Sequence, residues 1–198
     1  MTFKILAAVP GWLVRLRLVL GPVLLGSALL HAPGIWLATG LIVAFLSDVF
    51  DGIIARRVGV STPELRVADS RADVLFYLCV LAGVCALKGD LLWTLRWPFL
   101  GLVLIQLASW RMDRIKFGRG SALHSYTAKA WGITLFLAAF ALFADLNARP
   151  YLVLALWMGY LSNVEDIAIK LVLPSWHCDV GSVWHAWQIR KHEQASIP

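Results

Sequence analysis

Long uncharged stretches alternate with short, basic segments along this chain. The first stretch, Leu18 to Ser47, contains no Lys, Arg, Asp or Glu, and only the segment from His31 to Gly34 interrupts it. Because that segment contains adjacent proline and glycine, which favour a turn, the pattern predicts two helices, Trp12 to Leu30 and Gly34 to Arg57. Each is about long enough to cross a hydrocarbon core of about 30 Å at about 1.5 Å per residue.

Further apolar stretches follow, and they reach spanning length when the charged residues at their ends are included. They predict four more helices: Val67 to Lys88, Leu91 to Arg111, Ser125 to Asn147 and Pro150 to Leu171. No repeat, linker or low-complexity segment divides the chain. We therefore predict an all-α fold, an integral membrane bundle of six transmembrane helices that forms a single domain over residues 1–198.

The composition supports a membrane protein, because 60% of the residues are hydrophobic and only 15% are charged. An ordinary soluble domain has about 25% charged residues, so a soluble globule is excluded. The net charge of +6 is also typical of nucleic-acid binding. In so apolar a chain, however, the basic residues belong at a membrane surface, and we expect no nucleic-acid partner.

The basic residues predict the orientation in the membrane. All 18 Lys and Arg residues fall on one face of the predicted bundle except Lys88, Arg96 and Arg149. Short loops rich in Lys and Arg stay in the cytoplasm, so both termini are predicted to be cytoplasmic. We predict that residues 1–16 form an N-terminal interfacial helix. The tail from Trp176 to Glu193 forms either a second interfacial helix or a solvated segment.

The acidic residues between the second and third helices carry the most informative chemistry. Asp48 and Asp51 share one helix face, as do Asp69 and Asp73. The short connection makes these helices antiparallel neighbours, so the four carboxylates are expected to converge at the cytoplasmic membrane surface. Placing a carboxylate in a membrane helix costs roughly 2.5–3.5 kcal/mol, and four like charges repel one another. A cation must therefore compensate them.

Two kinds of cation are candidates. The cluster is flanked by four arginines, Arg56, Arg57, Arg66 and Arg71. A carboxylate-rich site is also what hard divalent cations select, above all Mg²⁺ when a phosphorylated substrate supplies the remaining oxygens. Gly52 and Ala55 are small residues beside the aspartates, and they would let a ligand approach the helix closely. The segment therefore predicts a site for a diphosphate together with a metal.

Seven residues of this segment fit one signature, D-x2-D-G-x2-A-R followed by D-x3-D: Asp48, Asp51, Gly52, Ala55, Arg56, Asp69 and Asp73. The pattern resembles that of the CDP-alcohol phosphatidyltransferases, integral membrane phospholipid synthases. The segment from Pro10 to Pro22, with Arg17 five residues before a proline, is similar to the first helix of that family. One position departs from the pattern: Leu65 stands where the family has a glycine close to the nucleotide, whereas Thr62 keeps the family's threonine.

The resemblance implies transfer of a phosphatidyl group from CDP-diacylglycerol to a small alcohol, with release of CMP, in phospholipid biosynthesis. It implies Mg²⁺ or Mn²⁺ as cofactor, as two ions held by Asp48, Asp51, Asp69 and Asp73. Asp73 would also be the catalytic base. Residues implied to contact the CDP group are Gly52, Ala55, Arg56 and Thr62. Leu65 adds bulk there, so we expect the connecting loop or the cytidine to be placed differently.

The acceptor is predicted to be glycerol 3-phosphate, because basic residues cluster between the fourth and fifth helices: Arg111, Arg114, Lys116, Arg119 and Lys129. Of these, Arg111, Arg114 and Lys129 are the predicted acceptor ligands; alternatively, the cluster only fixes the topology. Near the end of the sixth helix, Asn163, Glu165 and Asp166 either line the same cavity or cap the helix. The resemblance suggests a homodimer in the inner (plasma) membrane of a bacterium, with membrane lipids as partners and the active site at the cytoplasmic interface.

Two alternatives remain. Intramembrane carboxylates also mark ion paths, so the chain could be a divalent-cation transporter. A transporter predicts acidic residues spread across the bilayer, whereas the first, fourth and fifth predicted helices have none in their middles. The other alternative, motivated by Leu65, is a catalytically impaired relative that binds lipid without turnover.

Overall fold

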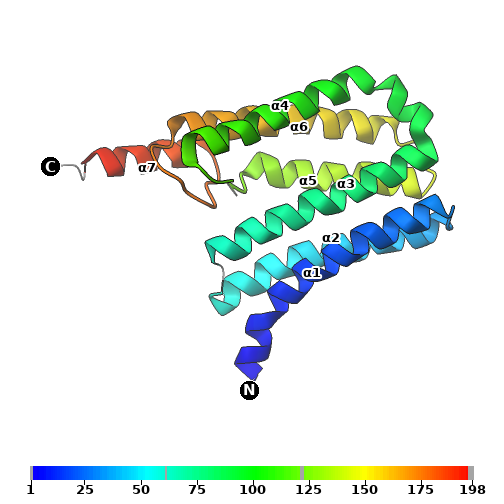
Figure 1. Cartoon of the computed structure of the whole chain (residues 1–198), viewed down its shortest axis with the longest axis horizontal. Helices are drawn as coiled ribbons and strands as arrows, with labels where there is room; N and C mark the ends of the chain where they lie inside the picture. Colours follow the sequence, from blue (N-terminus) through cyan, green and yellow to red (C-terminus); the bar gives the residue numbers. More distant parts are fainter. Residues whose placement is uncertain (1, 61, 121–122, 196–198) are drawn as a thin grey trace. The chain divides into compact units, whose positions relative to one another are not determined.

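The computed structural model describes residues 2–60, 62–120 and 123–195, and within these ranges the chain forms helices and no strand (Figure 1). The helices are α1 (Thr2–Leu29), α2 (Gly34–Val58), α3 (Pro63–Thr94), α4 (Arg96–Phe117), α5 (Tyr126–Phe143), α6 (Arg149–Val172) and α7 (Val183–Ala195). The predicted all-α class is therefore confirmed. The three cysteines are all free.

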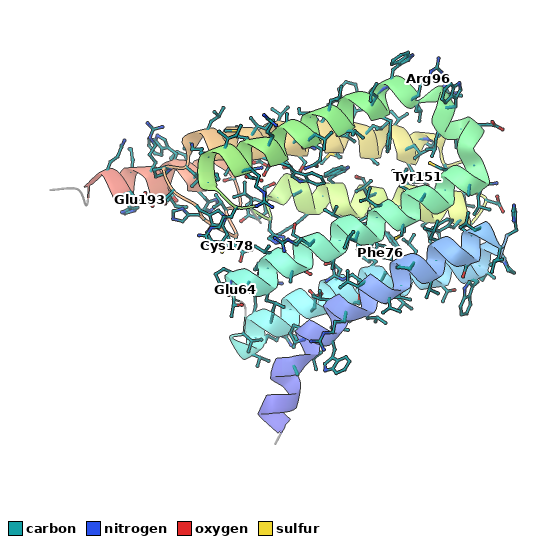
Figure 2. The ribbon with its side chains drawn as sticks, in the orientation of Figure 1. Glu64, Phe76, Arg96, Tyr151, Cys178 and Glu193 are labelled. Carbon is teal, nitrogen blue, oxygen red and sulfur yellow. The ribbon has the colours of Figure 1, made fainter. Side chains whose placement is uncertain are left out.

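Five helical segments among the described residues are long and apolar enough to cross a membrane: Ala8–Leu29 of α1, α2, α3, α5 and α6. Only 22% to 33% of the most apolar window of each is buried, and large apolar side chains project outward along the helices (Figure 2). Water-soluble proteins rarely expose so much apolar surface. Lipid is the solvent that suits these faces.

The fourth predicted span, Leu91 to Arg111, corresponds to α4, which is not among those five. Charged residues at both ends of α4 shorten its apolar part to the stretch from Trp97 to Trp110. The backbone of α3 leaves helical geometry at Lys88 (φ −137°, ψ 36°), where the third helix was predicted to end, and helix then continues to Thr94. As a result α4 begins at Arg96 rather than at the predicted Leu91. The count of six spans stays a prediction.

The first predicted span and the segment before it form one helix, α1, with Pro10 and Pro22 inside it. A proline within a helix removes a backbone hydrogen bond and favours a kink. Figure 1 shows the N-terminal end of α1 bending away from the rest of the helix. An interfacial position for residues 1–16 stays a prediction.

The chain divides into two compact units, of which the first contains residues 1–94 and 136–148. Within it α1 packs against both α2 and α3 (Figure 1). Glycines permit the close approach of α1 and α3: a Cβ at Gly21 would lie 3.3 Å from the Cα of Phe76, and a Cβ at Gly83 would lie 3.1 Å from the Cβ of Ala28. Small residues at helix contacts are typical of membrane bundles, where packing replaces the hydrophobic effect.

A tight connection joins α2 to α3. Gly59 ends α2 in the left-handed conformation (φ 73°), which glycine adopts without steric cost, and its N–H bonds the carbonyl of Ala55. The hydroxyl of Thr62 accepts a hydrogen bond of 3.2 Å from the N–H of Leu65 and so caps α3. These two contacts fix the two ends of the short connection between the helices that carry the acidic residues.

The second unit contains residues 95–135 and 149–198. In it α4 packs against α6, and α7 packs on the end of α6. The junction of α6 and α7 is a buried apolar cluster of Leu123, Ile169, Leu173, Val180 and Ala186. Within the predicted tail, α7 thus docks through its apolar face, while Trp184 and Trp187 stay exposed.

A buried ion network connects α4 to α6. The Nζ atom of Lys170, which is 1% exposed, lies 2.9 Å from Oδ2 of Asp113 and 2.6 Å from Oδ2 of Asp166. It also donates a hydrogen bond of 2.6 Å to the hydroxyl of Ser109. Asp166 is therefore an ion-pair partner of Lys170, a role that the sequence analysis did not consider.

We expect Lys170→Met to destabilise the protein strongly. The substitution leaves Asp113 and Asp166 without their cation, which costs about 3–5 kcal/mol for a buried pair, or roughly 6–20 °C in the unfolding midpoint of a chain of this size. Lys88→Met is the matched control, because Lys88 pairs with Asp145 on the exposed surface and such pairs contribute about 0–1 kcal/mol. Thermal unfolding in detergent micelles measures the unfolding midpoints of both variants. Equal midpoints would show that the buried ion network stabilises the protein no more than the exposed ion pair does.

Candidate functional site

The four aspartates of the signature surround one guanidinium group in the first unit. Nη1 of Arg17 forms an ion pair of 2.6 Å with Asp48 and a second with Asp73. Nη2 forms an ion pair of 2.5 Å with Asp69 and another with Asp51. Three helices contribute: α1 supplies the arginine, and α2 and α3 each supply two aspartates. The structure thus brings together the carboxylates that the helical spacing placed on two neighbouring faces.

The cluster has a buried side and an open side. The side chains of Asp51 and Asp69, which share Nη2, are 5% and 8% exposed. Those of Asp48 and Asp73, which share Nη1, are 43% and 33% exposed. A substrate can therefore approach the outer pair, while the inner pair forms the floor of the site.

The position of Arg17 follows from the pattern of α1. Val14, Gly21, Leu24 and Ala28 are buried, and with Arg17 they recur every three or four residues, the spacing of one helix face. Arg17 is thus the single charged member of a stripe that faces α2 and α3, whereas its neighbour Arg15 is exposed. The long side chain carries its charge from this stripe to the ends of the acidic helices.

The carboxylates fit a hard divalent cation. Oxygen atoms of Asp48, Asp51 and Asp69 lie within 4.8 Å of one another, so the three carboxylates form a group that could hold a metal ion. When all four aspartates are ionised, Arg17 neutralises only one of four negative charges, which leaves a surplus of three. Oxygen donors, spacing and surplus charge together suit Mg²⁺ or Mn²⁺.

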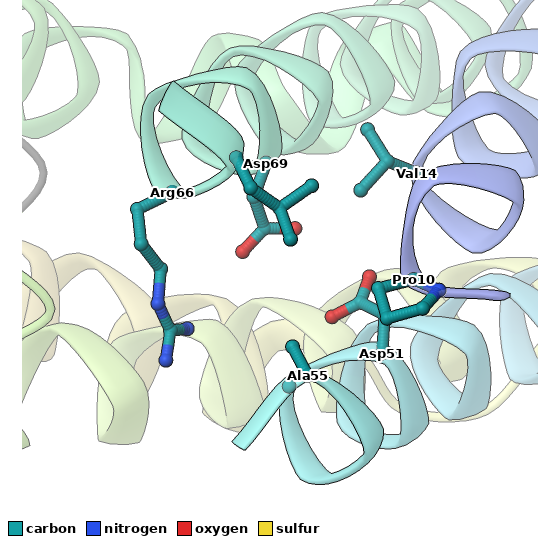
Figure 3. Close-up of a pocket in the computed structure, with 8 residues that line it drawn as sticks. Pro10, Val14, Asp51, Ala55, Arg66 and Asp69 are labelled. Atoms are coloured by element: carbon teal, nitrogen blue, oxygen red, sulfur yellow. The ribbon is translucent and has the colours of Figure 1, made fainter. Parts of the chain in front are cut away.

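A small pocket adjoins the cluster, and in Figure 3 the carboxylates of Asp51 and Asp69 face it from different helices. Its lining is Pro10, Val14, Asp51, Gly52, Ala55, Leu65, Arg66 and Asp69. Arg56 lies over Gly52, because a Cβ there would be 3.3 Å from Nη1 of Arg56. Three of the residues predicted to contact CDP, Gly52, Ala55 and Arg56, are therefore in or beside the pocket. Thr62, the fourth, caps α3.

The residues predicted to bind the acceptor lie in the second unit, where Arg111, Arg114 and Lys129 have exposed side chains. Two other members of that basic cluster have structural contacts. Lys116 donates hydrogen bonds to backbone carbonyls at the end of α6. Arg119 stacks 3.6 Å from the ring centroid of Trp176. The acceptor role of the exposed three stays a prediction.

Two further residues near the end of α6 have partners inside the second unit. Asn163 donates a hydrogen bond of 2.9 Å to the carbonyl of Gly159. Glu165 accepts one from the hydroxyl of Thr127 on α5. These contacts join or brace helices, so a cavity-lining role for either residue stays a prediction.

A family model of the CDP-alcohol phosphatidyltransferases matches residues 7–165. The chain belongs to this family. CDP-alcohol phosphatidyltransferases are phosphotransferases that use divalent metal ions in phospholipid synthesis, with CDP-alcohols as substrates and membrane lipids as partners. Membership and the five apolar helices together make this chain an integral membrane protein. No curated protein and no solved structure matches it.

The main counter-ion of the site is Arg17, which contacts all four aspartates. The four arginines that flank the cluster in the sequence were the predicted salt-bridge partners, yet Arg56 and Arg57 have exposed side chains. The signal that would have identified Arg17 is its position in the small and apolar stripe of α1. A charge in such a stripe must face another helix.

We expect replacement of Leu65 to strengthen nucleotide binding. Leu65 is half-buried and lines the pocket beside Asp51 and Asp69, so Leu65→Gly makes room where the family has glycine. Leu65→Ala separates this effect from the loss of helix propensity, which is about 1 kcal/mol for glycine. Titration calorimetry with CDP and Mg²⁺ should give tighter binding for both variants; unchanged affinity in both would show that Leu65 does not restrict the nucleotide.

Proposed function

We propose that this CDP-alcohol phosphatidyltransferase transfers the phosphatidyl group of CDP-diacylglycerol to glycerol 3-phosphate and releases CMP. The observation that carries the proposal is the convergence of four carboxylates, from two apolar helices, beside a pocket. A donor with a nucleotide head and two acyl tails needs a polar site at the end of membrane helices. This arrangement provides one.

In the proposal Asp48, Asp51, Asp69 and Asp73 hold Mg²⁺ or Mn²⁺, as two ions. Bound divalent ions would neutralise the diphosphate and stabilise the negative charge on the departing CMP. Gly52 and Ala55 leave room for the donor at the helix surface, Arg56 contacts the diphosphate, and Thr62 contributes to the nucleotide site by shaping the start of α3. These roles follow the family signature. The lining of the pocket, which includes Gly52 and Ala55, supports the roles of these two residues.

Asp73 is the proposed catalytic base. Its side chain is 33% exposed, so an acceptor hydroxyl can reach it more readily than it can reach the buried Asp51 or Asp69. The carboxylate takes the hydroxyl proton as the acceptor oxygen forms a bond to the phosphorus that carries diacylglycerol. The bond from that phosphorus to the oxygen of CMP breaks, and CMP leaves with the electron pair.

Cationic side chains are the proposed ligands of the acceptor. Arg111, Arg114 and Lys129 bind the phosphate of glycerol 3-phosphate, to which cationic side chains donate charge-assisted hydrogen bonds. The enzyme is a homodimer of the bacterial inner membrane with cytoplasmic termini and active site. A divalent-cation transporter has less support, because the four aspartates form one cluster and the family consists of phosphotransferases.

Asp73→Asn should lower turnover about 10²–10⁴-fold, because an amide cannot accept the hydroxyl proton at neutral pH. The assay follows CMP release from CDP-diacylglycerol with Mg²⁺ and glycerol 3-phosphate in micelles. Asp90→Asn, on the exposed part of α3, is the control and should retain full activity. Persistent activity of Asp73→Asn would remove Asp73 as the base, and no CMP release from the unmodified protein with any alcohol would favour an impaired relative.

Lys129→Met should raise the KM for glycerol 3-phosphate about tenfold or more, because a hydrogen bond between charged groups contributes about 1.5–3 kcal/mol. The KM for CDP-diacylglycerol should not change. Lys88→Met controls for the loss of one positive charge. In a panel with serine, glycerol and inositol phosphate, glycerol 3-phosphate should react fastest; a preference for an uncharged acceptor would contradict the assigned role of Lys129.

A further inference from the structure

We propose that Arg17 is a displaceable counter-ion: its guanidinium fills the aspartate cluster in the absence of metal, and binding of divalent ions drives it out. This inference rests on the metal site in the proposed function and extends it to the residue that competes for that site. The cluster then has two alternative occupants, an arginine supplied by the chain and metal ions supplied by the solution.

Arg17 and a metal ion cannot occupy the cluster together. Both Nη atoms contact the same carboxylate groups that a metal would bind, with Oδ1 of Asp48 at 2.6 Å and Oδ1 of Asp69 at 2.5 Å. A metal ion needs these oxygens at about 2.0–2.1 Å. An ion bound among oxygens that lie within 4.8 Å of one another would occupy the space of the guanidinium nitrogens. Arginine stays charged, so repulsion between the two cations adds to the steric conflict.

The hydrogen-bond donors of Arg17 are not all satisfied where it lies. Its side chain is 1% exposed, and its Nε is buried without a hydrogen-bond partner among the residues that the structure describes. A buried donor left without a partner is costly. The four ion pairs hold the guanidinium in spite of this cost. Divalent ions that bind the same carboxylates more strongly would break these ion pairs and so free the guanidinium.

The exposure of the four aspartates indicates the side from which ions reach the cluster. The two aspartates on Nη1, Asp48 and Asp73, are 43% and 33% exposed, whereas the two on Nη2 are nearly buried. Ions therefore reach the cluster from the open side, and they meet the contacts of Nη1 first. Loss of those two ion pairs leaves the guanidinium held through Nη2 alone.

Arg17→Met tests the proposal through metal affinity in the absence of substrates. Without the competing cation, the variant should bind Mn²⁺ about tenfold or more tightly than the unmodified protein, measured by calorimetry or by the EPR signal of free Mn²⁺. Its metal-free form should melt at a lower temperature, and its stabilisation by Mn²⁺ should be larger. Arg15→Met is the matched control, because the exposed Arg15 lies two residues away; its affinity should not change.

Equal or weaker Mn²⁺ binding by Arg17→Met would overturn the displacement, while turnover by the unmodified enzyme would leave the proposed function standing. If neither protein binds Mn²⁺, the metal site itself is wrong and both proposals fail. A second measurement needs no substitution: phenylglyoxal modifies accessible arginines, and mass spectrometry should find Arg17 protected without metal and modified with Mn²⁺. Protection of Arg17 in the metal-loaded protein would also overturn the inference.

Discussion

The site depends on how the chain balances four negative charges at the ends of two membrane helices. Neither α2 nor α3 neutralises its own aspartates in the cluster; α1 supplies the positive charge through Arg17. The contact therefore links three helices as well as compensating charge. One guanidinium leaves most of the negative charge unbalanced when all four aspartates are ionised, and this remainder makes the cluster compatible with metal binding as well as a structural contact.

The sequence was sufficient to predict the acidic cluster because helical spacing is local. Separations of three residues between Asp48 and Asp51 and four between Asp69 and Asp73 place each pair on one face, and the connection brings the faces together. The partners of Arg17 and Lys170 could not be predicted in this way, although the stripe of α1 indicates that Arg17 faces another helix. Each was counted among the basic residues that orient the chain, and each is in fact 1% exposed in an ion network. Which helices surround a basic residue depends on long-range packing.

The helices were predicted best where apolar sequence is bounded by a strong signal. Gly34 begins α2 as predicted, since proline and glycine precede the apolar stretch, and α6 begins at Arg149, next to the predicted Pro150. The junction between α3 and α4 was predicted poorly, because helical residues continue beyond the irregular backbone of Lys88. Charge at the ends of α4 also weakens its hydropathy signal, although the segment is a continuous helix.

The short connection from Gly59 to Thr62 has a consequence for how this segment can vary. Each residue added to the start of α3 would turn the following side chains by about 100° around the helix axis, and the carboxylates of Asp69 and Asp73 would turn away from Arg17 of α1. Gly59, in the left-handed conformation, and the cap of Thr62 fix where α2 ends and where α3 begins, and so the rotation of α3 about its axis. Insertions and deletions in this segment should therefore be tolerated far less than in an ordinary surface loop, because they would change the rotation of α3 about its axis and move its two aspartates out of the cluster.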